Sequence, residues 1–154
     1  MRQFNKILTT FLVLAAMLFT SCKEHQADRH KEIAADSLIN SAYNVRDYNL
    51  ILDLANLHQQ AGTLSSQKAC YWRGYAYSRQ RKMRMAEMEW KTAITLSIDN
   101  EEDLEYYARS SNRLAGLLFA KSDYSEAIRV AVAATTLLKK KNYTMNTDYA
   151  NLLT

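Results

Sequence analysis

The chain has 154 residues and contains no proline, only three glycines and only two cysteines. Because proline and glycine are the strongest helix breakers, their scarcity predicts a fold made almost entirely of helices. The cysteines are Cys22 and Cys70, which excludes a framework of several internal disulfides. The 20 basic and 16 acidic residues form a mixed balance, which does not fit the strongly basic surface of a nucleic-acid-binding protein.

One apolar run stands out, and it lies at the N-terminus. Arg2 and Lys6 come before the run, and residues 7–19 are almost all apolar. Small residues follow it. A positive start, a short apolar core and a small-residue end are the parts of a secretory signal. The run is too short to cross a bilayer comfortably, because a spanning helix needs about 20 apolar residues.

The end of this run reads Phe19-Thr20-Ser21-Cys22 and resembles the lipobox of bacterial lipoproteins. The resemblance implies that residues 1–21 are a signal peptide removed by cleavage and that Cys22 is lipidated. Phe19 replaces the leucine that is usual at its position. An ordinary signal peptide cut nearby and an uncleaved anchor are the alternatives. Residues 22–30 are polar and would form a tether between the lipid and the domain.

Apolar residues recur at helical spacing in six segments after the tether. Asp47 is placed to cap the second segment, and Gly62 fits a helix stop at its end. Asp123, with Glu126 three residues later, predicts a reciprocal cap. The breaks between segments are Arg46-Asp47, Gly62 to Ser66, Arg79 to Lys82, Asp99 to Glu102 and Ser122-Asp123.

Helices in successive pairs indicate internal repeats. Gly74, Tyr77, Ala86, Trp90 and Ala93 are a small residue, an aromatic, an alanine, an aromatic and an alanine at spacings of three, nine, four and three. With this spacing, residues 67–100 resemble a tetratricopeptide repeat. Residues 104–141 resemble a second copy, 32–65 a degenerate one, and 145–154 the start of another. The resemblance implies that the repeats pack through Gly74, Tyr77, Ala86, Trp90, Ala93, Ala115, Tyr124, Ala127 and Ala134.

The copies are unequally spaced. Ile51 to Ala86 is 35 residues, close to the family period of about 34, but Ala86 to Ala127 is 41. Seven residues are therefore additional. We expect them as two extra helical turns in the fourth and fifth helices, around residues 99–107.

The resemblance implies an all-α fold, an α-α superhelix in which antiparallel helix pairs form a right-handed solenoid. In this family the first helix of each pair lines a concave groove that binds peptides. An ordinary polar helix face is the alternative for this surface. Alignment of the small residues of each copy assigns Asp36, Asn40, Tyr43, Lys68, Tyr71, Tyr75, Arg79, Arg109, Asn112 and Phe119 to the groove.

No pattern in the chain argues for an enzyme. His25, His30 and His58 are scattered and suggest no metal cage. Cys70 lacks a catalytic partner pattern and is expected to be a buried, inert thiol. We therefore expect no cofactor, no metal, no small-molecule substrate and no nucleic acid. The basic turn around Arg79, Arg81, Lys82 and Arg84 is either an anion contact or an ordinary exposed loop.

These features lead to two hypotheses. The first is a non-catalytic scaffold that binds a protein or peptide and is membrane-anchored in the bacterial cell envelope, facing the periplasm or the cell surface. The second is the extracytoplasmic sensing end of a larger protein in signal transduction. Lipoprotein-like signals followed by such repeats resemble the N-termini of some Bacteroidetes sensor histidine kinases and transcriptional regulators. The unpaired segment at 145–154 favours a fragment of a longer protein, and a short cap that docks on the sixth helix is the alternative.

Overall fold

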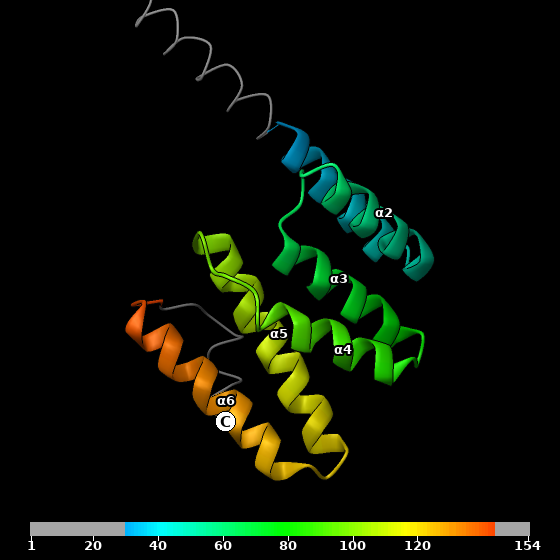
Figure 1. Ribbon diagram of the computed structural model, residues 1–154. Helices are drawn as coiled ribbons and strands as arrows, with labels where there is room; N and C mark the ends of the chain where they lie inside the picture. Colours follow the sequence, from blue (N-terminus) through cyan, green and yellow to red (C-terminus); the bar gives the residue numbers. More distant parts are fainter. Residues whose placement is uncertain (1–29, 144–154) are drawn as a thin grey trace, which may run out of the picture.

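The computed structural model describes residues 30–143, and all regular structure within that range is helical. Residues 30–44 are helical, and five further helices follow (Figure 1). The all-α prediction is confirmed. The predicted signal peptide, Cys22, most of the tether and the partial repeat at 145–154 lie outside the described residues. The five helices are α2 (Tyr48–Gln60), α3 (Ser66–Arg79), α4 (Met83–Ala93), α5 (Glu101–Ala120) and α6 (Tyr124–Lys140).

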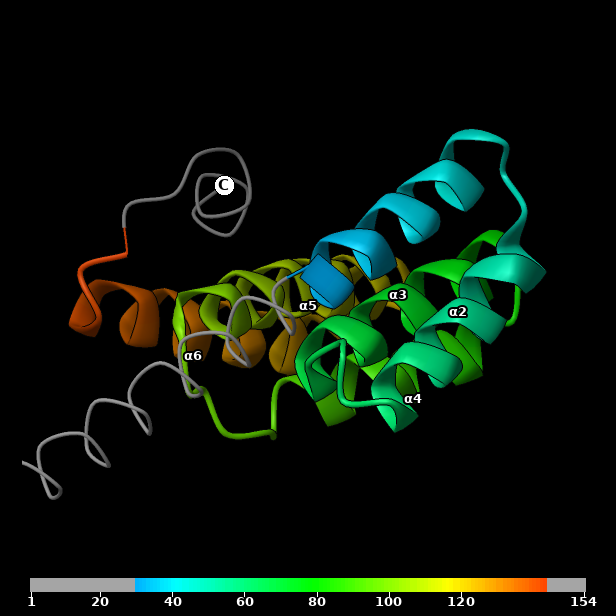
Figure 2. The same ribbon diagram turned by 90° about the horizontal axis from the view of Figure 1, so that it is seen from above.

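Successive helices pack against one another along the chain. α3 contacts α2, α4 and α5, whereas α6 packs on α5. In both views α2 and α6 lie at opposite ends of the array (Figures 1 and 2). α3 and α5 also touch across the chain order, so these two helices lie side by side. This arrangement places residues 30–44, α3 and α5 on one surface.

Side-chain caps fix where the helices begin. The carboxylate of Asp47 accepts a hydrogen bond from the Leu50 amide at 3.0 Å, as the sequence predicts. Asn100 accepts one from the Asp103 amide at 2.8 Å. Each bond satisfies an amide that the first helical turn leaves unpaired. After α2 the chain turns at Gly62, whose φ of +68° suits glycine.

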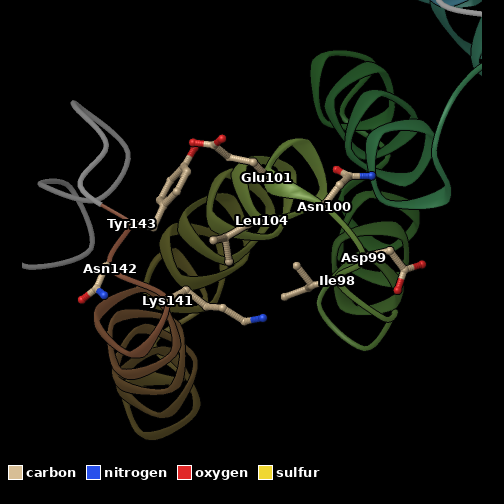
Figure 3. Close-up of a pocket in the computed structure, with 8 residues that line it drawn as sticks. All are labelled: Ile98, Asp99, Asn100, Glu101, Leu104, Lys141, Asn142 and Tyr143. Carbon is tan, nitrogen blue, oxygen red and sulfur yellow. The ribbon is translucent and has the colours of Figure 1, made fainter.

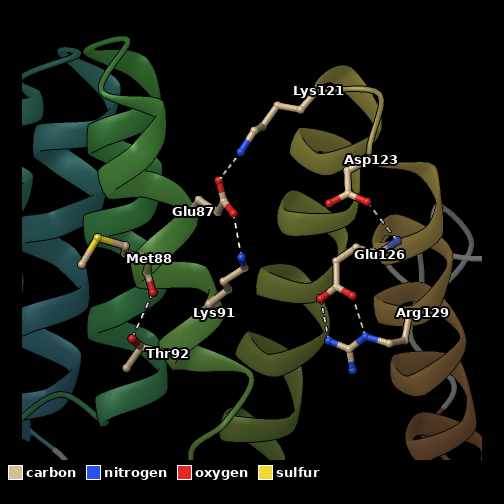
Figure 4. Close-up of polar contacts among 8 residues, drawn as sticks. All are labelled: Glu87, Met88, Lys91, Thr92, Lys121, Asp123, Glu126 and Arg129. Carbon is tan, nitrogen blue, oxygen red and sulfur yellow. Dashed lines mark hydrogen bonds and ion pairs between the residues drawn. The ribbon is translucent and has the colours of Figure 1, made fainter.

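The cap at Asp123 is one-sided. Its carboxylate accepts from the Glu126 amide at 3.4 Å, but the carboxylate of Glu126 binds Arg129, with Oε2 2.6 Å from Nε (Figure 4). The Asp123 amide donates instead to the Leu118 carbonyl at 3.0 Å. The predicted reciprocal cap is therefore wrong in its second half, because an ion pair with Arg129 takes the side chain of Glu126.

One turn geometry recurs at the ends of four helices. Arg46, Arg81, Ser122 and Asn142 have φ values of 59°, 61°, 62° and 52°. In each case the next residue donates its amide to the carbonyl five positions back, as Lys82 does to Tyr77 at 2.9 Å. This is the Schellman arrangement, which usually has glycine at the left-handed position. The sequence signal for these turns is weak because other residues occupy that position.

Two apolar clusters form the core. The larger runs from residues 30–44 through α2, α3 and α4 to α5 and α6, and the smaller joins Leu104 and Tyr107 of α5 to Ala134 and Leu138 of α6. Close approach is most demanding at Gly74, where an added Cβ would lie 2.6 Å from Cδ1 of Trp90. Ala86, Ala93, Ala127 and Ala134 are buried, Tyr77 and Ala115 are half-buried, and Tyr124 is 51% exposed.

The additional residues lie at the C-terminal end of α5. α4 has only 11 residues, whereas α5 has 20. Lys68 of α3 pairs with Glu102 of α5, a separation of 34, so the end of α3 at Arg79 corresponds to Arg113. Residues 114–120 are then the extra two turns. The expectation of extra turns around residues 99–107 was wrong, because contacts between α3 and α5 align their first turns.

Candidate functional site

A row of six aromatic side chains crosses the surface formed by residues 30–44, α3 and α5, and one of the six, Tyr48, comes from the start of α2. Tyr43 lies 5.8 Å from Trp72 and 5.4 Å from Tyr75, measured between ring centroids. Tyr71 in turn lies 5.3 Å from both Trp72 and Tyr106. Most of these pairs are tilted or edge-on, which is the favourable geometry for aromatic contacts. We call Tyr43, Tyr48, Tyr71, Trp72, Tyr75 and Tyr106 the aromatic row.

Only one end of the aromatic row is open to solvent. Tyr71, Trp72 and Tyr106 are buried, whereas Tyr43 is 43% exposed. Tyr48 and Tyr75 are half-buried, with their ring centroids 6.4 Å apart. We call Tyr43, Tyr48 and Tyr75 the open end of the row. The buried half stabilises the fold, and the open end is the part that a ligand can reach.

Arginine lies over this open end. Nε of Arg79 donates to the Tyr48 hydroxyl at 3.3 Å, and its guanidinium lies 5.9 Å from the Tyr48 ring centroid. The hydrogen bond to Tyr48, followed by the nearby Tyr75, raises the pKa of Arg79, so the cation persists at every physiological pH. Stacked arginine and tyrosine side chains offer planar groups and donors, both of which are enriched where proteins bind peptides.

Arg109 lies farther along, at the buried end of the row. Its guanidinium is 5.7 Å from the Tyr106 ring centroid, and its Nε donates to Glu105 at 2.8 Å. Burial raises the pKa of the Tyr106 hydroxyl to about 12. Tyr106 is therefore a neutral packing residue, and Arg109 is held on it by Glu105.

Lys68 lies beneath this surface and is almost fully buried. Its side chain is 2% exposed, and Nζ lies 2.6 Å from Oδ2 of Asp36 and also binds Glu102. The ammonium lies 5.4 Å from the Tyr106 ring centroid. Burial alone would lower the pKa of Lys68, but hydrogen bonds to Asp36 and Glu102 raise it. The pair partners come from residues 30–44 and from α5, so Lys68 links three helices.

The structure separates the predicted groove residues into three groups. Tyr43, Tyr75 and Arg79 lie at the open end, and Asn40 is an exposed residue one turn before Tyr43 in the same helix. Asp36, Lys68, Tyr71 and Arg109 belong to the ion-pair and aromatic contacts beneath or beside it. Asn112 and Phe119 lie elsewhere. Phe119 is 65% exposed, and its ring centroid is 5.1 Å from that of Tyr124.

The displacement of Phe119 follows from the register of α5. The alignment of small residues matches each position of α3 with the position of α5 that lies 41 residues later. The residues that actually meet are closer in sequence: Lys68 and Glu102 are 34 apart, and Tyr71 and Tyr106 are 35 apart. Sequence reasoning missed Tyr106 and Glu102 for the same reason. It also missed Tyr48 as a member of this surface, although the tyrosine follows the Asp47 cap. A search for residues 34 apart from Lys68 and Tyr71 would have found the α5 partners or their neighbours.

A hollow lies where the extra turns of α5 face the junction of α3 and α4. Ser78, Met83 and Trp90 line one side, and residues of α5 from Asn112 onward, with Lys121, line the other. Its volume is about 480 Å³, within the range of roughly 300–1,000 Å³ that is usual for ligand pockets. We call it the junction pocket.

Another hollow, of about 390 Å³, lies between the start of α5 and the end of α6 (Figure 3). Ile98 and Leu104 form its apolar part, and Lys141 reaches toward them. The side chains of Asp99 and Asn100 point away from Lys141 (Figure 3). Asp99 and Asn100 therefore do not converge with Lys141 on one point, as the polar groups of a specific binding site do.

The described residues contain no group of three or more His, Cys, Asp or Glu side chains that could hold a metal ion. Burial raises the pKa of the Cys70 thiol to about 11, which suits the expected inert thiol. Nδ1 of His58 lies 2.9 Å from the Thr63 hydroxyl, at the end of α2. Cys70 and His58 therefore have contacts typical of residues that support the fold.

No model of a known protein family, no curated protein and no solved structure matches the chain. Among the helices in residues 30–143, none is both long enough and apolar enough to cross a membrane.

Proposed function

We propose that this protein is a non-catalytic peptide-binding scaffold of the tetratricopeptide type, anchored in the bacterial cell envelope through a lipidated Cys22. The observation that supports binding most strongly is the open end of the aromatic row with Arg79 above it. Exposed tyrosine and arginine on a rigid helical surface supply large contact areas at low entropic cost.

The repeat architecture is supported by local geometry. The Schellman turns at Arg46 and Arg81 are 35 residues apart, and the turn at Ser122 follows 41 residues later. These intervals equal the spacing of the repeats proposed from sequence. Contacts between residues 30–44, α3 and α5 also suit stacked helix pairs, in which the first helices form one continuous surface.

The open end can be tested because its side chains are accessible. Tyr43→Ala combined with Arg79→Ala removes an exposed ring and an exposed guanidinium. The matched control, Leu57→Ala with Arg84→Ala, changes two other exposed positions, on α2 and α4. We expect a partner that co-purifies with the wild-type protein and with the control to be lost from the Tyr43/Arg79 variant. Equal recovery with both variants would reject this surface.

The anchor has a separate test. Membrane fractionation and intact mass of the natural product are compared with those of a Cys22→Ala variant. The proposal requires a membrane-bound chain of residues 22–154 plus acyl groups, and release of the variant. An unmodified Cys22 would reject lipid anchoring without affecting the peptide-binding proposal.

A second candidate is the sensing end of a larger signalling protein. It is favoured by α6, where Ile128 and Val132 are 64% and 57% exposed on the side away from the α5-facing residues. In a longer helical array another pair of helices would cover such a face. A natural product much larger than this chain, retained in the membrane without Cys22, would support this candidate over a free-standing lipoprotein.

A further inference from the structure

Gly116 occupies an unfavourable position for glycine. It lies within α5, where glycine costs about 1 kcal/mol relative to alanine. An added Cβ would meet no atom within 4 Å, so packing inside the chain does not require glycine here. Gly74 shows the opposite situation, because its missing side chain makes room for Trp90. The space left by Gly116 opens into the junction pocket.

The walls of the junction pocket are largely apolar. Trp90 and Met83 come from α4, and Leu117 and Ala120 come from the extra turns of α5. The seven additional residues thus supply one wall of the pocket, which a helix of the length of α3 would lack. Such a surface favours a bulky aliphatic or aromatic group.

The rim of the junction pocket is cationic. Arg113 and Lys121 line it, and no acidic residue does. Arg113 is exposed, and within residues 30–143 its side chain makes no hydrogen bond or ion pair. An anionic group can therefore bind Arg113 without displacing an existing partner.

Lys121, the second cation of the rim, shares its carboxylate partner, Glu87, with Lys91. Nζ of Lys121 and Nζ of Lys91 each lie 2.7 Å from the carboxylate of Glu87 (Figure 4). Hydrogen bonds from both lysines lower the pKa of Glu87, so this group of three carries one net positive charge at neutral pH. With Arg113, the pocket rim attracts anions.

We propose that the junction pocket is a second peptide site, which takes one large apolar side chain flanked by acidic residues. The apolar side chain would enter the space beside Gly116, and the flanking carboxylates would lie at Arg113 and Lys121. This inference rests on the proposed function as a peptide-binding scaffold. It adds a site distinct from the open end of the aromatic row and defines the chemistry of the segment bound there.

The test uses a synthetic pentapeptide with one phenylalanine between pairs of aspartates, titrated into the full chain in detergent micelles. The indole N–H signals of the two tryptophans report binding by NMR, since Trp90 lines the pocket and Trp72 does not. We expect the Trp90 signal to shift in a saturable manner and the Trp72 signal to stay in place. Replacing the phenylalanine by glycine should weaken binding at least tenfold, because burial of a large side chain supplies most of the affinity.

Gly116→Leu adds a bulky side chain at a position where a Cβ meets open space, and it removes a helix-breaking residue. We therefore expect it to occupy the pocket and its melting temperature not to fall. We expect it to weaken peptide binding at least tenfold. Ala133→Leu, at an exposed position of α6, is the matched control and should bind within twofold of wild type. Arg113→Gln should weaken binding several-fold and reduce its dependence on salt.

Absence of a Trp90 shift, or unchanged binding by Gly116→Leu, would overturn the proposal. A third result would also overturn it: the peptide does not bind, the chain self-associates, and Gly116→Leu abolishes the self-association. A second copy of the chain would then be the occupant of the pocket. These results would leave the Tyr43/Arg79 test untouched. If the Tyr43/Arg79 variant loses its partner but the acidic peptide does not bind at the junction pocket, the second site is rejected and the peptide-binding scaffold is kept.

Discussion

The ammonium of Lys68 on α3 lies 2.6 Å from the carboxylate of Asp36, in the helix formed by residues 30–44. The lysine side chain is 2% exposed, whereas those of Asp36 and Glu102 are 35% and 32% exposed. The lysine therefore depends on its two partners for solvation, while the carboxylates remain partly hydrated. This asymmetry makes Lys68 the most sensitive member of the network.

Replacing Lys68 should destabilise the protein. Lys68→Met keeps much of the side-chain length but leaves two half-buried carboxylates without their cation, and we expect the free energy of unfolding to fall by about 2 kcal/mol. Lys121→Met, which breaks an exposed ion pair, should change it by less than about 0.5 kcal/mol. Urea denaturation compares the two, and an equal effect would contradict the role of Lys68 as a link between helices.

The two glycines of α3 and α5 should respond in opposite directions to alanine. Gly74→Ala forces a Cβ against Trp90 and should destabilise the protein by about 1–3 kcal/mol. Gly116→Ala meets open space and should stabilise it by about 0.5–1 kcal/mol. Thermal unfolding measures both variants. A stabilised Gly74→Ala protein would show that α3 and α4 are not packed as described.

Glu32 should destabilise the fold when it ionises. Burial, followed by the hydrogen bond and charge of Glu102, raises its pKa above 4.5. The folded state then holds this proton more tightly than the unfolded state, so stability falls as pH rises from below 4.5 through the raised pKa. Glu32→Gln should raise the melting temperature at pH 7 and have little effect at pH 4.

The dependence of stability on pH has the opposite sign for Glu87, which serves as the control for Glu32. Hydrogen bonds from Lys121 and Lys91 lower its pKa, so its contribution is present above 4.5 and is lost as pH falls through the lowered pKa. Glu87→Gln should lower the melting temperature at pH 7. If both variants shifted in the same direction, the described charge environments would be incorrect.

Cys70 should be protected in the folded protein. With its pKa raised to about 11 by burial, fewer than about one thiol in a hundred is ionised at pH 8, and only the thiolate reacts rapidly. Peptide mapping after iodoacetamide treatment should find the Cys70 peptide unlabelled in the native state and fully labelled in urea. Labelling at similar rates in both states would refute burial of the thiol.

Local features of this fold were predictable from sequence, whereas non-local register was not. Asp47 and Gly62 act within one turn of the chain, so their capping and stop roles follow from neighbouring residues. The position of α5 depends on contacts between Lys68 and Glu102 and between Tyr71 and Tyr106. Small-residue spacing cannot determine those contacts, because the extra turns lie at one end of α5 and shift the alignment by seven.

The burial of Lys68 was equally hidden from the sequence. A lysine is ordinarily assigned to a solvated face, and only its acidic partners, 32 residues before it and 34 after it, favour another interpretation. The open end of the aromatic row was partly foreseen in Tyr43, Tyr75 and Arg79. Tyr48 was not, because it lies at the start of α2 and joins the surface through its contact with Arg79.

The most direct test of the central claim is photo-crosslinking in intact cells. A benzoylphenylalanine replaces Tyr43 at the open end of the aromatic row or, in a control chain, the exposed Leu57 on α2. Peptide binding at the open end predicts a defined protein adduct from position 43 that is absent from position 57 and disappears when Arg79→Ala is added. No adduct from position 43, or equal adducts from both positions, would contradict a binding site on this surface.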